Sequence, residues 1–232
     1  METNYWKADP WTWRELAALL LLEFGVVIFG IKGTLSTRYE QWMGDPLYAG
    51  TLTGLTIALV LTGGVYLIAL GRGRLSWHEV GLGCFPHVSW QQILLWALTA
   101  LACSAAAMLL ASLFGNSFAN TKTDALQQAM GPEALAVAFV SAVIVSPIYE
   151  EIFYRGFVYR WLRPRTGRGW ATVLSALIHT VSHWPTTNVF PLALVTGFIL
   201  AWAYEQTRSI WPAIIIHGLI NLTALVVLAA LG

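Results

Sequence analysis

Apolar residues fill long, nearly uninterrupted stretches of this chain, and polar residues gather in the short segments between them. A membrane-spanning helix needs about 20 predominantly apolar residues, and seven stretches approach that length. There is no internal repeat and no sign of a second domain. The pattern predicts an all-α polytopic membrane protein of about seven transmembrane helices, with residues 1–232 forming a single integral membrane domain. The predicted spans are 14–31, 51–70, 90–114, 134–155, 170–187, 190–205 and 210–230.

Composition supports the same fold class. Of the 232 residues, 57% are hydrophobic and 11% are charged, whereas a soluble domain averages about 25% charged residues. The net charge is +1, so the basic surface that nucleic-acid-binding proteins carry is missing. The partner that the composition predicts is the lipid bilayer, and nucleic acid is excluded.

Lysine and arginine are unevenly distributed between the predicted spans, which predicts an orientation. Cytoplasmic loops of membrane proteins carry an excess of both residues. If the N-terminus is cytoplasmic, nine of them lie on that side and three on the other, with Arg155 left out because it belongs to a motif. The cytoplasmic set is Lys7, Arg14, Arg72, Arg74, Arg160, Arg163, Arg165, Arg168 and Arg208, and the opposite set is Lys32, Arg38 and Lys122.

Ionisable and amide side chains recur at a spacing of four inside the last predicted spans. A charge at mid-bilayer costs at least ~2.5 to 3.5 kcal/mol on insertion scales, so such residues are candidates for function. Residues four apart share one face of a helix. The spacing predicts that several helices direct these groups toward a common centre. The clusters are Glu150-Glu151-x-x-x-Arg155, His179-x-x-x-His183 and His217-x-x-x-Asn221.

The two adjacent glutamates are expected to differ in role. Glu151 and Arg155 can pair along one face and neutralise each other, or they can belong to an ion-pair network that only fixes helix packing. Glu150 points about 100° away and has no local cation. A carboxylate in that position can act as a general base toward water. Glu23, in the first predicted span, has no partner that the sequence identifies.

Each histidine pair has a chemical and a structural interpretation. His179 and His183 share the spacing of half a zinc site, although no glutamate follows His179 as the HExxH motif requires. They can equally be core histidines bonded to the backbone. His217 and Asn221 offer an imidazole and an amide that can donate to a developing oxyanion, or they can bond neighbouring helices.

In this order, the three motifs resemble those of the CPBP family. These are the CAAX proteases and bacteriocin-processing enzymes, also called the abortive-infection family of intramembrane proteases. The family pattern is EExxxR, then FxxxH, then HxxxN, and the resemblance covers residues 134–224, expected to be the catalytic core within the last four spans. Where the family usually has Phe, this chain has His179. The matching segments are EEIFYRGFVYR from Glu150, SALIHTVSHWP from Ser175 and AWAYEQTRSIWPAIIIHGLIN from Ala201.

The resemblance implies a protease that uses a glutamate, although older descriptions of the family call its members metalloproteases. By position, Glu150 and His183 would activate the water. His217 and Asn221 would hold the oxyanion of the intermediate. These four residues are the expected catalytic set.

Three further residues are expected to support the catalytic set. Glu151 and Arg155 would hold it in place, and His179 adds a possible ligand or base to the second motif. No cofactor is favoured, and zinc is left open. The zinc ligands then expected are Glu150, His183 and His217.

The sequence therefore favours an intramembrane endopeptidase of the glutamic type, acting on a membrane-associated protein or peptide in the bacterial cytoplasmic (inner) membrane. The substrate could be a CAAX-type lipidated tail, a bacteriocin leader or a protein-sorting tail. The alternatives are a zinc-dependent version of the same protease and a non-catalytic membrane chaperone or immunity protein. A transporter is disfavoured because no inverted repeat is present. The catalytic cavity is expected to open on the side that carries Arg160 to Arg168.

Overall fold

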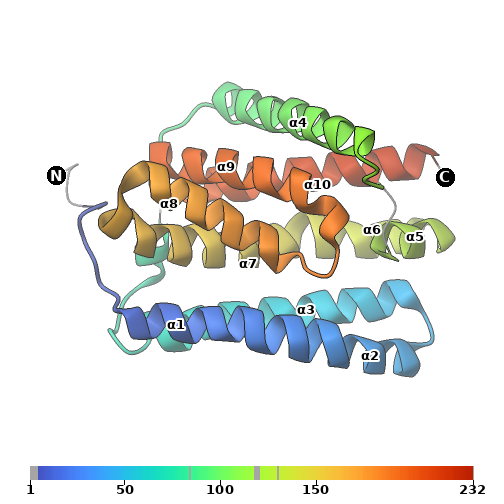
Figure 1. Cartoon of the computed structure of the whole chain (residues 1–232), viewed down its shortest axis with the longest axis horizontal. Coiled ribbons are helices and arrows are strands. Elements are labelled where there is room, and N and C mark those ends of the chain that lie inside the picture. The colour runs from blue at the N-terminus through green and yellow to red at the C-terminus, as the bar shows by residue number, and fades with distance from the viewer. Residues whose placement is uncertain (1–4, 84, 118–120, 130, 232) are drawn as a thin grey trace.

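The computed structural model describes residues 5–231 apart from residues 84, 118–120 and 130 (Figure 1). Regular structure in the described part is entirely helical, which confirms the predicted all-α fold. The elements of the first half are α1 Trp13–Leu21, η1 Leu22–Leu35, α2 Ser36–Met43, α3 Pro46–Gly64, η2 Val65–Leu70, η3 Trp77–Val80 and α4 Trp90–Leu113. Those of the second half are α5 Thr121–Gln128, α6 Pro132–Ala138, η4 Phe139–Val145, α7 Ser146–Glu151, η5 Ile152–Tyr159, α8 Arg160–Ser182, η6 Thr187–Val189, α9 Phe190–Thr207 and α10 Trp211–Leu231.

Among the described residues, six helical stretches are long and apolar enough to cross a membrane. They make the chain an integral membrane protein. The predicted number of about seven transmembrane helices is close to the six found among the described residues. The fourth stretch, Pro132–Ser182, contains the predicted span 134–155 and most of the predicted span 170–187. Gly167 interrupts it with φ 77° and ψ 171°, in a region of backbone space that favours glycine. The chain reverses there, so that the end of α8 runs back along α7 (Figure 1).

The EExxxR motif lies on a continuous helical stretch formed by the end of α7, η5 and the start of α8, residues 150–162. This stretch is called the central helix. Every residue from Glu150 to Leu162 is buried, and a helix that is buried all round lies in the protein core rather than against lipid. Phe153 and Phe157 belong to its largest buried cluster, which extends to α1 and α3. Helices α8 and α9 pack against η5, and α10 packs against α7 and η4, the segments that precede η5 in the chain.

The N-terminal segment binds the far end of this central helix. Arg160 donates to the carbonyl of Ala8 at 2.6 Å, and its guanidinium lies 4.5 Å from the ring centre of Tyr5. Arg163, one turn further along, forms an ion pair of 2.7 Å with Glu205 near the end of α9. These contacts hold the central helix in position at the end where the basic residues lie.

Candidate active site

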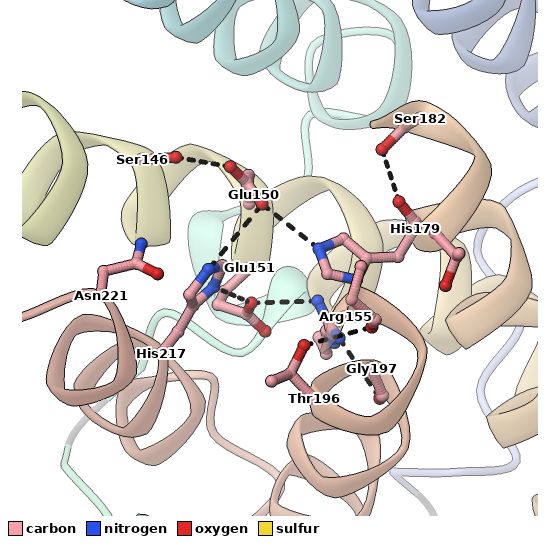
Figure 2. Close-up of polar contacts among 12 residues, drawn as sticks. Ser146, Glu150, Glu151, Arg155, His179, Ser182, Thr196, Gly197, His217 and Asn221 are labelled. Carbon is pink, nitrogen blue, oxygen red and sulfur yellow. Dashed lines mark hydrogen bonds and ion pairs between the residues drawn. The ribbon is translucent and has the colours of Figure 1, made fainter. Parts of the chain in front are cut away.

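The three motifs meet around the carboxylate of Glu150 (Figure 2). Its Oε2 lies 3.2 Å from Nε2 of His179 and 4.0 Å from Nε2 of His217. Its Oε1 accepts a hydrogen bond of 2.5 Å from the hydroxyl of Ser146, one turn earlier on the same helix. Among the described residues no lysine or arginine pairs with Glu150, as the sequence predicts. The carboxylate is therefore held by neutral or titratable donors and stays available to a water molecule.

Glu151 faces a different set of groups. Its Oε1 accepts from Nη1 of Arg155 at 3.0 Å, so the ion pair predicted from the spacing is present. The same oxygen lies 2.9 Å from Nδ1 of His217. Arg155 also donates to the carbonyl of Gly197 on α9 at 3.2 Å. Glu151 and Arg155 thus tie the central helix to both α9 and α10.

The contact with Glu151 determines how His217 can act. An ionised carboxylate only accepts hydrogen bonds, so Nδ1 of His217 carries the proton and Nε2 faces Glu150. In the neutral ring Nε2 then has a lone pair and no proton. Donation to an oxyanion requires the charged imidazolium, and two carboxylates at 2.9 and 4.0 Å stabilise a positive charge there.

His179 lies closer to Glu150 than the sequence leads one to expect. His179 and His183 lie on the last turn of α8 and at its C-terminal cap, with ring centres 5.1 Å apart. The predicted partner of Glu150 in water activation is His183, and its ligand atom lies within 4.8 Å of those of Glu150 and His179. The ring of His179 also lies within hydrogen-bonding distance of Glu150. Tyr154 packs edge-on against His179, with the two ring centres 4.8 Å apart. The hydroxyl of Ser182 donates to the backbone carbonyl of His179 at 2.7 Å. His179 is therefore a buried, oriented member of the site.

One ligand atom each from Glu150, His179 and His183 lie within 4.8 Å of one another. Carboxylate oxygen and imidazole nitrogen are common zinc ligands, so this donor set fits a transition metal. The set differs from the one expected from the sequence, which has His217 in place of His179.

Asn221 lies beside His217 on α10, one turn further along (Figure 2). Its amide donates to the carbonyl of Ala142 at 2.8 Å, in the π-helical segment η4. A side-chain amide has two N–H groups, and the second makes no hydrogen bond within the described residues. At Gly218 an added Cβ would lie 2.9 Å from the carbonyl oxygen of Val143, so only glycine allows α10 to approach η4 this closely.

The first span also reaches the site, which the sequence does not predict. Glu23 is 1% exposed, and its carboxylate interacts with Tyr154 and with the charge of Glu150. Lys32 donates to the carbonyl of Ser182 at 2.6 Å, next to the cap residue His183. A glutamate and a lysine nine positions apart in an apolar span indicate that this span has a function. Nothing in the sequence indicates which helix they face.

Comparison with known protein families identifies the same part of the chain. Residues 132–223 match the family model described as "Type II CAAX prenyl endopeptidase Rce1-like". This segment contains all three motifs, so the resemblance to the CAAX protease family is confirmed over its length.

Two curated bacterial proteins are similar to parts of the chain. "Putative membrane peptidase YdiL" of Bacillus subtilis (strain 168) is 29% identical over 89 residues, which are 38% of this chain and 36% of that protein. "UPF0177 protein YbdI" of Lactococcus lactis subsp. lactis (strain IL1403) is 31% identical over 93 residues, 38% of this chain and 47% of that protein. The similarity thus spans less than half of each curated relative. No solved structure matches the chain significantly.

Proposed function

We propose that this protein is an intramembrane endopeptidase that hydrolyses a peptide bond in a membrane-associated protein or peptide. The observation that carries the proposal is the buried carboxylate of Glu150, placed between ring nitrogens of His179 and His217 and free of arginine and lysine within the described chain. The match to a family of endopeptidases supports the reaction class. The catalytic core is residues 134–224 of a single membrane domain.

The reaction needs a base, an oxyanion site and a route for the proton. Glu150 takes a proton from water, whose oxygen attacks the scissile carbonyl carbon. The imidazolium of His217 and the second N–H of Asn221 donate to the oxyanion of the tetrahedral intermediate. The C–N bond then breaks, and the proton on Glu150 passes to the leaving amine nitrogen. His183, within reach of Glu150, helps to hold the water.

Glu151 and Arg155 act through other residues. The pair keeps His217 oriented, because a carboxylate bonded to one ring nitrogen sets the tautomer and the direction of the other. The bond from Arg155 to Gly197 adds α9 to this support. An added Cβ at Gly197 would lie 3.0 Å from Cβ of Ala176, so glycine also lets α9 lie close to α8 here.

The substrate is expected to be membrane-associated because the catalytic side chains project from helices that cross the bilayer. Candidates are a CAAX-type lipidated tail, a leader peptide or a sorting tail, processed in the bacterial cytoplasmic membrane. A zinc-dependent version of the protease, with Glu150, His183 and His217 as the ligands expected from the sequence, is the second candidate. A non-catalytic chaperone or immunity role is the third.

The test uses the host organism with its own gene deleted. The strain is complemented with the wild type, with Glu150→Gln, or with Glu40→Gln, an exposed glutamate on α2. Peptide termini in the membrane fraction are then compared by mass spectrometry. Wild type and Glu40→Gln should produce the same new termini, and Glu150→Gln should lose them while inserting normally, because removal of a general base costs about 10²- to 10⁴-fold. Equal termini in the Glu150→Gln strain would refute the proteolytic role of Glu150.

A further inference from the structure

Glu150, His179 and His183 form a compact donor set that peptide hydrolysis by a glutamate base does not fully use. One ligand atom of each lies within 4.8 Å of the other two, and Glu150 and His179 are already 3.2 Å apart. His179 is 1% exposed, and its Nδ1 has no hydrogen-bond partner in the described part of the chain. Glu150 and His179 are buried and His183 is half-buried, and a buried imidazole nitrogen without a partner is costly unless it binds an ion.

We infer that these three side chains bind a divalent transition metal of the zinc class. Zinc takes imidazole nitrogen and carboxylate oxygen at about 2.0 to 2.2 Å, so tetrahedral ligand atoms lie about 3.3 Å apart. The contact between Glu150 and His179 already has that separation, and a small rotation of His183 completes the set.

The site depends on a residue particular to this chain. His179 occupies the position where the related motif has phenylalanine, which cannot bind a metal. The four-residue spacing of His179 and His183 places both rings on one side of the α8 terminus, where they face the central helix. The fourth position is open to water or to Nε2 of His217, which lies 4.0 Å from the carboxylate of Glu150.

A bound ion and a glutamate base exclude each other. A metal ion bound to Oε2 of Glu150 would draw electron density from the carboxylate and lower its basicity. The ion would also occupy the space beside His179 where the water would lie. Zinc should therefore inhibit cleavage, and a chelator should restore it. This consequence rests on the proposed function, whereas the metal site itself does not.

Metal binding is measured first, without substrate. The chain is purified in detergent, stripped with a chelator and titrated with Co²⁺, whose visible spectrum reports tetrahedral nitrogen and oxygen ligands, and then with Zn²⁺ as competitor. A single ion per chain is expected. His179→Phe and His179→Gln should each weaken binding at least about tenfold, since even loss of an outer-shell partner costs 10- to 100-fold. His87→Ala, in an exposed loop, is the matched control.

Two results would overturn the metal site: no binding by a folded wild-type chain, or unchanged affinity in both His179 variants. Thermal unfolding of each variant shows that it is folded. The activity arm compares cleavage with and without zinc for each protein. Inhibition of the wild type that is weaker in His179→Phe supports the exclusion, and stimulation by zinc would overturn it. Cleavage by the metal-free chain tests the proposed function separately.

Discussion

Nδ1 of His217 lies 2.9 Å from Oε1 of Glu151, the oxygen that also accepts from Arg155. The second glutamate of the motif therefore faces α10 and not the carboxylate of Glu150. Adjacent helical positions point about 100° apart, so the two acids serve different sides of the central helix. In the proposed mechanism, Glu150 faces the reacting water and Glu151 orients the histidine that stabilises the oxyanion.

Glu151→Gln should separate these two roles. The amide keeps the shape of the side chain but removes the negative charge that stabilises the imidazolium of His217. We expect kcat to fall by about 10- to 100-fold, the usual cost of losing a carboxylate that orients a functional histidine, with little change in KM. The kinetic constants are measured with the substrate that the mass-spectrometric comparison of peptide termini identifies. Wild-type kcat in a folded Glu151→Gln chain would contradict the orienting role.

Arg155→Ala should damage folding as well as activity. The substitution leaves the carboxylate of Glu151, which is 0% exposed, without its guanidinium. Removing one partner of a buried ion pair costs roughly 3 to 5 kcal/mol. Thermal unfolding in detergent should show this loss, and Arg38→Ala, an exposed arginine on α2, should not.

A double variant sharpens this test. If the cost arises from the unpaired charge, Glu151→Gln combined with Arg155→Ala should be more stable than Arg155→Ala alone. Equal stability of the single and double variants would instead place the cost in the lost bond to Gly197.

Asn221→Leu should distinguish chemistry from helix packing. Loss of one oxyanion donor lowers kcat by about 10²- to 10³-fold, whereas loss of the bond to Ala142 costs on average only about 0.6 kcal/mol in membrane helices. A large kinetic effect with a small change in stability supports the donor role. The reverse pattern, a destabilised chain with unchanged kcat, would leave Asn221 as a helix-packing residue.

Whether a contact in the site can be predicted from the sequence depends on how far apart its two residues lie in the chain. The pair of Glu151 and Arg155 follows from spacing alone, because both lie on one helix face. The contact of Glu150 with His179 does not, because it depends on how α8 rotates against α7 after the reversal at Gly167. Apolar length predicts the spans well, yet it gives no information on which polar atoms meet between them.

For the same reason, the sequence does not predict that the first span reaches the site. Glu23 and Lys32 stand out as ionisable residues in an apolar stretch, but the site residues that they approach lie more than 120 positions away in the chain. Such contacts depend on the packing of whole helices, and a single sequence does not reveal them.

The last prediction concerns access to the site. His217 is six residues from Trp211, where α10 begins, which is ~9 Å at 1.5 Å per residue. Fourteen further residues, ~21 Å, separate it from the other end of that helix at Leu231. The site therefore lies nearer the end of the molecule where Arg163 pairs with Glu205. We expect this end to be cytoplasmic, because most of the lysines and arginines outside the spans are assigned to it.

Thiol labelling tests that expectation. With Cys84 and Cys103 replaced by serine, Ser146→Cys beside Glu150 and Asn221→Cys beside His217 are treated with a membrane-impermeant maleimide in oriented vesicles. Both should react only when the cytoplasmic face is outward, as should the control Arg208→Cys. Thr37→Cys, on exposed α2, should react only in vesicles of the opposite orientation. If the two site cysteines share the behaviour of Thr37→Cys, the site is reached from the other side of the membrane and the proposed access is wrong.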